Sequence, residues 1–170
     1  MFLCGCSYRT DRTAAGEAGI IRVGIDLVRT DRFEFIRGVG GRSFYRRVYT
    51  KPEQEAYGDM LSDLAACFAG KEAVSKILGT GLSLGSVDRV SCSDIEILYS
   101  QQHVLLSNQA RGFAQQLGLV DIVVRFFVAS SWVCAIAGGT TDIALHNKML
   151  ECIESAGRDV TSRLIHSQNM

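Results

Sequence analysis

The stretch that most constrains the fold is LAACFAGKEAVSKILGTG, at residues 64–81. Apolar side chains recur here at helical spacing, which predicts one helix over residues 61–78 with glycines at its end. Glu72 and Lys76 are four residues apart and therefore share one face of this helix. They could be an ordinary surface pair. They could also belong to a metal and phosphate site that an acidic residue from elsewhere completes.

Asp26 is the candidate for that acidic residue. It lies in IIRVGIDLV, residues 20–28, whose β-branched composition predicts a strand. Because side chains alternate along a strand, Asp26 points to the face opposite the large apolar residues. A carboxylate in such a strand must be solvated or bound to something. It is therefore either a solvent-facing carboxylate near a strand end or part of the site.

Composition limits the class of protein. The chain has 170 residues, 47% of them hydrophobic, which suits one globular domain or two small halves that share a core. Eighteen basic and eighteen acidic residues cancel, which argues against nucleic-acid binding through bulk positive charge. A local basic patch is still possible, and it would consist of Arg42, Arg46, Arg47 and Lys51.

The cysteines and the apolar runs indicate in which cellular compartment we expect the protein. None of the six cysteines forms a CxxC pair, and no His/Cys group has zinc-finger spacing, so we expect reduced, packed thiols. The N-terminus is unlike a signal peptide, because charges follow a short apolar start at once. No apolar run approaches the roughly 20 residues of a membrane span. The sequence therefore predicts a soluble cytoplasmic protein.

The order of elements predicts an α+β domain. Residues 1–19 are expected to be a flexible leader, residues 20–139 the domain, and residues 140–170 a partly helical extension. The expected strands are 20–28, 93–99, 103–106, 121–129 and 132–138, the last two joined as a hairpin. The expected helices are 30–37 before a glycine break, one starting at the capping sequence TKPE, 61–78, 108–117 and 143–153. This order favours an antiparallel sheet packed against a long central helix.

Two motifs resemble those of the holo-acyl carrier protein synthases: GIDLV at residues 24–28 and FAGKEAVSKILGTG at residues 68–81. TKPE at 50–53 and DIEI at 94–97 follow in the order that the family shows. The resemblance implies the 4'-phosphopantetheinyl transferase fold. It also implies transfer of the phosphopantetheine arm of coenzyme A to a serine of an acyl carrier protein. The family uses magnesium, and its short members are homotrimers with active sites at subunit interfaces.

The resemblance also assigns roles to residues. Asp26 and Glu72 match the metal carboxylates and, with Lys76, the catalytic set. The expected contacts to coenzyme A come from Lys76, Gly79, Gly81 and Ser130, with Lys71 either a further contact or only a neighbour. The expected contacts to the acidic carrier protein come from Arg32, Arg46 and Arg47.

The chain departs from the family at two positions. Cys67 stands where the family commonly has arginine, and Ala129–Ser130 stand where it usually has a Ser-His pair. Both missing side chains are expected to hold the coenzyme A nucleotide. Other basic residues could substitute for them, for example Arg89, Arg111 or Arg125. The alternative function is a repurposed homologue that binds an acyl carrier protein, or acts on a carrier-bound substrate, without phosphopantetheinyl transfer.

Overall fold

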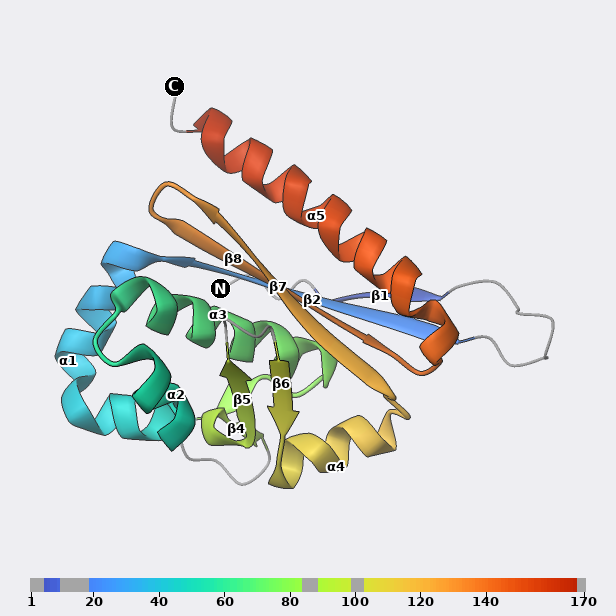
Figure 1. The fold of residues 1–170 in the computed structure, drawn as a ribbon, viewed down its shortest axis with the longest axis horizontal. Coiled ribbons are helices and arrows are strands. Elements are labelled where there is room, and N and C mark those ends of the chain that lie inside the picture. Colours follow the sequence, from blue (N-terminus) through green and yellow to red (C-terminus); the bar gives the residue numbers. More distant parts are fainter. Residues whose placement is uncertain (1–4, 10–18, 84–88, 99–102, 168–170) are drawn as a thin grey trace.

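A four-stranded antiparallel sheet with strand order β1-β2-β8-β7 runs through the centre of the molecule (Figure 1). The computed structural model describes residues 5–9, 19–83, 89–98 and 103–167. The strands of the sheet are β1 (Gly5–Arg9), β2 (Ile20–Arg29), β8 (Trp132–Thr140) and β7 (Asp121–Ala129). Long β7 and β8 form the predicted hairpin, and β2 pairs with β8 along its length.

Helices cover both faces of this sheet (Figure 1). The long helix α3 (Leu61–Ile77) lies on one face and α5 (His146–Ser167) on the other. The remaining helices are α1 (Thr30–Val48), α2 (Lys51–Tyr57) and α4 (Asn108–Gln116), with short 3-10 turns at Cys92–Asp94 and Ile143–Leu145. Two small ladders complete the fold: parallel β3 (Leu82–Ser83) with β4 (Val90–Ser91), and antiparallel β5 (Ile95–Leu98) with β6 (His103–Leu106). The predicted α+β fold is confirmed.

Helix α3 packs closely on β2 because the side chains at the contact are small on both elements. Buried alanines line the side of α3 that contacts the sheet, among them Ala69 and Ala73. Gly24 lies beneath them, and a Cβ added there would overlap the carbonyl oxygen of Ala73. Only glycine permits this approach. It places the backbone around Asp26 directly beside the last turns of α3.

Three stretches differ most from the expected elements. The leader contains strand β1, which pairs with β2. Helix α1 continues through Gly38 and breaks only at Gly41, where φ is +53°, because a helix tolerates glycine unless the chain must leave helical geometry. The last helix is longer than predicted and reaches Ser167, because Ala156 and Val160 continue its apolar side against the sheet.

For membrane spans and thiols, the structure can be compared with the sequence predictions within the described residues. Within it, no helix is long and apolar enough to cross a membrane. Cys67, Cys92, Cys134 and Cys152 are free thiols there, and the first three are buried. Burial raises the pKa of the Cys92 and Cys134 thiols to about 11, which keeps them protonated and unreactive.

Candidate active site

Asp26 and Lys76 meet between β2 and the last turn of α3. The Lys76 ammonium lies 2.8 Å from Asp26 Oδ1 and donates a second hydrogen bond, 2.5 Å long, to the carbonyl oxygen of Ile25. The side chain of Lys76 is only 13% exposed and that of Asp26 only 20%, so the pair is partly desolvated. An ammonium has three N–H donors. Among the described residues, two of them have acceptors, so one remains for a ligand.

Glu72 lies one helical turn before Lys76, in the field of the same two charges. Partial burial raises the pKa of Glu72, the negative charge of Asp26 raises it further, and Lys76 lowers it. Within the described residues, its carboxylate takes part in no hydrogen bond or salt bridge. A half-buried carboxylate without hydrogen-bond partners destabilises the fold when it is charged, and a cation bound beside it reduces this destabilisation.

The two carboxylates, Asp26 and Glu72, fit a magnesium ion. Mg²⁺ is usually bound by one or two carboxylates, and substrate phosphates and waters supply its other ligands. The described residues contain no group of three or more His, Cys, Asp and Glu side chains that could hold a metal alone. The pair therefore suits an ion that arrives with a phosphate ligand better than a closed structural metal site.

Lys71 lies in the core, which argues against the prediction that it contacts coenzyme A. Its side chain and that of Glu53 are both 0% exposed, and their charged atoms are 2.7 Å apart. The other two N–H groups donate to the carbonyl oxygens of Val48 and Cys92, each at 2.8 Å. All three donors are used, so none remains for a phosphate. Lys71 joins α3 to the end of α1 and to the 3-10 turn at Cys92–Asp94.

Glu53 is equally saturated, which explains why the TKPE sequence matters. It completes the predicted capping box of α2, accepting from the backbone N–H of Thr50 at 2.8 Å. Its other carboxylate oxygen accepts from the backbone N–H of Ile97 at 2.7 Å and from Cys67 Sγ at 3.2 Å. Cys67 is therefore a buried partner of this carboxylate, on a different side of α3 from Glu72.

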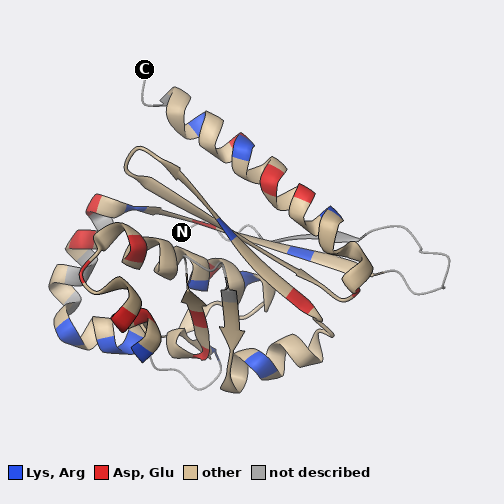
Figure 2. Cartoon of the chain, viewed as in Figure 1, with Lys and Arg blue, Asp and Glu red and all other residues tan. Residues whose placement is uncertain are grey.

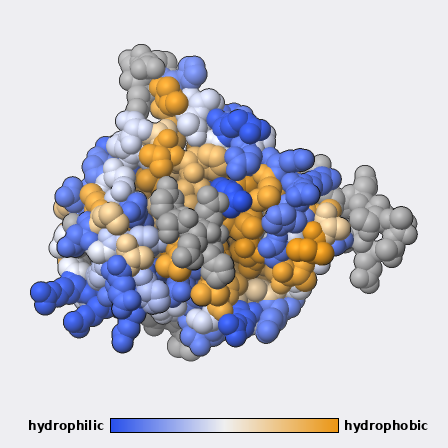
Figure 3. Space-filling view, in the orientation of Figure 1, coloured by the Kyte–Doolittle hydropathy of each residue, from blue (hydrophilic) through white to orange (hydrophobic). Residues whose placement is uncertain are grey.

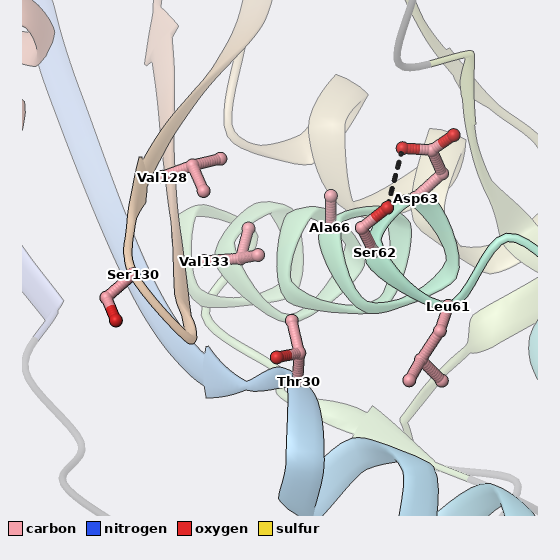
Figure 4. Close-up of a pocket in the computed structure, with 8 residues that line it drawn as sticks. All are labelled: Thr30, Leu61, Ser62, Asp63, Ala66, Val128, Ser130 and Val133. Atoms are coloured by element: carbon pink, nitrogen blue, oxygen red, sulfur yellow. Dashed lines mark hydrogen bonds between the residues drawn. The ribbon is translucent and has the colours of Figure 1, made fainter.

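Ser130 is not part of the Asp26 group in this chain. It occupies the turn of the β7–β8 hairpin with φ of +53°. Asp26 pairs with Ala135, so four to five residues, or about 15 Å of strand, separate the two positions. Ser130 borders a cleft of about 510 Å³ between the hairpin and the first turns of α3 (Figure 4).

Four polar and four apolar side chains line this cleft. They are Thr30, Leu61, Ser62, Asp63, Ala66, Val128, Ser130 and Val133. Ser62 donates to Asp63, and the Ser130 hydroxyl points away from α3 (Figure 4). The cleft has no basic side chain among these lining residues. Within this cleft, no lining side chain therefore replaces the missing histidine with a positive charge.

Arg22 is a basic residue that the sequence patterns did not single out. It lies on β2 four residues before Asp26, on the same face, and its Nε donates to the carbonyl oxygen of Ile77 at 2.5 Å. A terminal nitrogen of its guanidinium lies 3.5 Å from the Cβ position of Gly79. No carboxylate among the described residues pairs with it. The feature of the sequence that could have identified Arg22 is a positive charge within a predicted strand that is otherwise mostly apolar.

The predicted glycine turn follows α3 directly. Gly79 and Gly81 both have positive φ, of 78° and 69°, so they bend the chain away from the helix axis as expected. The hydroxyl oxygen of Thr80, between them, is buried and has no hydrogen-bond partner in the described part of the chain. A buried polar atom without a partner is uncommon. The turn therefore contains a buried hydroxyl without a described partner, one residue after Gly79, whose Cβ position lies beside Arg22.

Two of the three predicted carrier-binding residues are exposed on α1. Arg46 and Arg47 are exposed in its last turn, near exposed Arg42 and Lys51, and Figure 2 shows these basic residues gathered at the lower left. Arg47 donates to the hydroxyl of Ser43 at 2.7 Å. The side chain of Arg32 lies outside the described residues. Of the basic residues suggested as substitutes, Arg125 faces α5, where it approaches Glu154 at 3.8 Å.

Comparison with known proteins decides the family. The family described as the 4'-phosphopantetheinyl transferase superfamily matches residues 22–137, more than half of the chain. The chain belongs to this superfamily. The match contains every residue of the Asp26, Glu72 and Lys76 group.

Relatives and solved structures agree with this membership. The holo-[acyl-carrier-protein] synthase of Ruminiclostridium cellulolyticum is 32% identical over 134 residues, covering 75% of this chain and 97% of that protein. The synthase of Moorella thermoacetica is 36% identical over 131 residues, covering 69% and 92%. The synthase structure from Neisseria meningitidis matches with a TM-score of 0.59 at 24% identity, covering 69% and 95%. The Helicobacter pylori synthase in complex with coenzyme A matches with 0.55 at 24% identity, covering 68% and 96%. The structural likenesses show the shared fold.

Proposed function

We propose that this chain transfers the 4'-phosphopantetheine arm of coenzyme A to a serine hydroxyl of an acyl carrier protein, with a magnesium ion held by Asp26 and Glu72. The observation that carries the proposal is the convergence of Asp26, Glu72 and Lys76 within the family-matched region. Their chemistry, two carboxylates and a lysine with one free donor, suits a pyrophosphate bound with a divalent cation.

The reaction has a simple balance of bonds. The serine hydroxyl loses its proton to solvent and its oxygen bonds to the β-phosphorus of coenzyme A. The bond from this phosphorus to the bridging oxygen breaks, and adenosine 3',5'-bisphosphate leaves. Little covalent work falls to the protein, so catalysis is mostly positioning and charge stabilisation. The free N–H of Lys76 can donate to a phosphate oxygen as negative charge develops. Magnesium, when bound, would supply Lewis-acid stabilisation of the same charge.

Several finer statements belong to this proposal. We expect Gly79 and Gly81 to lie beside the nucleotide, and the exposed arginines of α1 to contact the acidic carrier. Ser130 as a contact to coenzyme A, a cytoplasmic location and a homotrimer remain predictions from the resemblance. We leave Lys71 out of the site because its donors are used in the core.

The direct test is intact-mass spectrometry of an apo acyl carrier protein incubated with this chain, coenzyme A and magnesium. We expect the carrier to gain the mass of one phosphopantetheine group, and chelation of magnesium to prevent the gain. Absence of a mass gain with several carriers would contradict the proposal. Carrier binding without transfer would instead support a repurposed carrier-binding homologue.

Arg22 is predicted to bind the 3'-phosphate of coenzyme A, which lies on the ribose and is not part of the pyrophosphate. It lies about 13 Å from Asp26 along β2, beside the glycine turn. We expect Arg22→Gln to raise the KM for coenzyme A about tenfold to a hundredfold, the equivalent of losing a charge-assisted hydrogen bond. The KM for 3'-dephospho-coenzyme A should change little.

Comparing coenzyme A with 3'-dephospho-coenzyme A shows whether Arg22 binds the 3'-phosphate or only supports the fold. If Arg22 serves only to cap α3, the substitution should affect both substrates equally. Arg158→Gln is the matched control, because Arg158 is exposed on α5, on the opposite face of the sheet from α3.

A further inference from the structure

Residues 48–50 form the junction between α1 and α2, and exposed basic residues flank this junction on both sides. Together these residues are the basic patch, which consists of Arg42, Arg46, Arg47 and Lys51. Figure 3 shows strongly hydrophilic surface at the lower left of the molecule, where Figure 2 shows the basic residues of α1. The junction itself lies in the core, because Val48 is 0% exposed and Tyr49 is 1% exposed. The chain therefore enters the core between the two surface segments that carry the patch.

The first half of α1 does not set the direction of the basic patch. The helix breaks at Gly41, where φ is +53° and ψ is −151°. A Cβ added at Gly38 or Gly41 would meet no atom within 4 Å, so packing does not brace this part of the helix. The segment after the break is held by the ring of Phe44, which packs in the core, and by the junction at its end. Its direction therefore depends on how the junction is fixed.

Hydrogen bonds fix the junction to α3. The carbonyl oxygen of Val48 accepts from Lys71 at 2.8 Å, and the hydroxyl of Tyr49 donates to the carbonyl oxygen of Leu64 at 2.8 Å. The ammonium of Lys71 also lies 5.9 Å from the centre of the Tyr49 ring. Lys71 directly precedes Glu72 in the sequence. One side chain therefore connects the end of α1 to the position of a candidate metal carboxylate.

Glu53 fixes the other side of the junction. Its carboxylate accepts from the backbone N–H of Thr50 at 2.8 Å and pairs with Lys71 at 2.7 Å. The same carboxylate accepts from the backbone N–H of Ile97 on β5 at 2.7 Å. The hydroxyl of Thr50 donates to Glu96, also on β5, at 2.8 Å. The pair of Glu53 and Lys71 therefore joins the junction to α2, α3 and β5 at once.

A buried charged pair is a poor source of stability, because the desolvation of two charges offsets their attraction. Apolar side chains of similar volume would fill the same space without that desolvation. The pair does specify geometry. All three donors of Lys71 have fixed acceptors on separate segments, so its bonds are satisfied by one arrangement of those segments. The advantage of this pair over an apolar core therefore lies in the placement of the junction.

We propose that Glu53 and Lys71 are positioning residues for carrier recognition: they fix the direction in which the basic patch projects relative to α3, which carries Glu72 and Lys76. The inference rests on the proposed function, because it takes an acidic carrier protein as the partner of the patch. Neither residue touches a substrate, since both side chains are 0% exposed. Their effect is on placement, and a misplacement of about 1 Å can lower a rate about a hundredfold.

The test is the double variant Lys71→Met, Glu53→Gln, which removes the bonds to the junction and leaves no unpaired charge in the core. We expect its KM for an apo acyl carrier protein to rise about tenfold or more, and its KM for coenzyme A to stay unchanged. A smaller folded fraction lowers the apparent kcat and leaves both KM values as they were. The KM for the carrier therefore separates positioning from stability.

The matched control is Lys148→Met, Glu151→Gln, which makes the same chemical changes at exposed positions of α5 and should alter neither KM. If the core double variant does not fold, Thr50→Val is the milder change. It removes the bond to Glu96 and the side-chain cap of α2, and it should still raise the KM for the carrier.

The outcomes separate this inference from the proposed function. A wild-type chain that transfers nothing to any carrier contradicts the proposed function itself. Wild-type transfer together with an unchanged KM for the carrier in the folded core variants overturns the positioning role alone. A raised KM for the carrier, with the KM for coenzyme A unchanged, supports it.

Discussion

Glu72→Gln should abolish phosphopantetheinyl transfer and at the same time stabilise the folded chain at neutral and alkaline pH. Transfer should fall by about a hundredfold or more, because an amide neither balances the metal charge nor binds magnesium well. The fold should gain stability because the half-buried carboxylate, which has no hydrogen bond or salt bridge among the described residues, is unfavourable when charged. Loss of function with a gain in stability is the signature of a residue retained for chemistry.

The sign of the pH dependence follows from the raised pKa of Glu72. Below the ordinary glutamate pKa, the carboxyl is protonated in both folded and unfolded chains, so the variant and the wild type should be equally stable. As pH rises through the raised folded pKa, the wild type must carry a partly buried charge and loses stability, while the glutamine variant does not. Denaturant unfolding without magnesium, at pH values on both sides of this range, measures the difference.

Glu55→Gln is the matched control for this experiment, since Glu55 is an exposed carboxylate on α2. It should leave both transfer and stability unchanged. Full transfer by the Glu72 variant would remove this residue from the metal site. Equal destabilisation of the variant at all pH values would mean that Glu72 has a structural role.

The second large effect is expected from Lys71→Met, which should destabilise the chain by about 3–5 kcal/mol. The substitution leaves Glu53 as an unpaired charge in a fully buried site and removes donors from two buried carbonyl oxygens. Because domains are typically stable by only about 5–15 kcal/mol, much of the stability would be lost. Chemical denaturation monitored by circular dichroism gives the free energy of unfolding directly.

Two further variants define the cause. Lys148→Met removes an exposed lysine of α5 and should have little effect. The double variant Lys71→Met, Glu53→Gln removes both buried charges and should recover part of the loss, because no unpaired charge remains. The folded fraction of the Lys71 variant should keep its KM for coenzyme A. A large rise in that KM without loss of stability would restore Lys71 to the binding site.

Lys71 and Lys76 show what residue patterns can and cannot predict. Lys71 and Lys76 lie on one helix, in one motif, and both could have been assigned to phosphate. Only the tertiary structure separates them: the end of α1, the 3-10 turn at Cys92–Asp94 and Glu53 enclose Lys71, while Lys76 reaches Asp26 on β2. Burial depends on which distant segments pack around a position, and spacing along one helix contains no such information.

The sequence by itself determined the local elements, the α+β class and the family, because periodicity, capping residues and two ordered motifs are properties of short segments. Spacing also fixed the face of Asp26 within its strand and of Glu72 within its helix, and the resemblance to the family predicted that the two act as a pair. It did not indicate that Arg22 reaches the end of α3, that Cys67 binds Glu53, or that the last helix covers the second face of the sheet. Those facts come from contacts between segments far apart in the chain. They exist only after β2, α3 and β8 have come together around a common core.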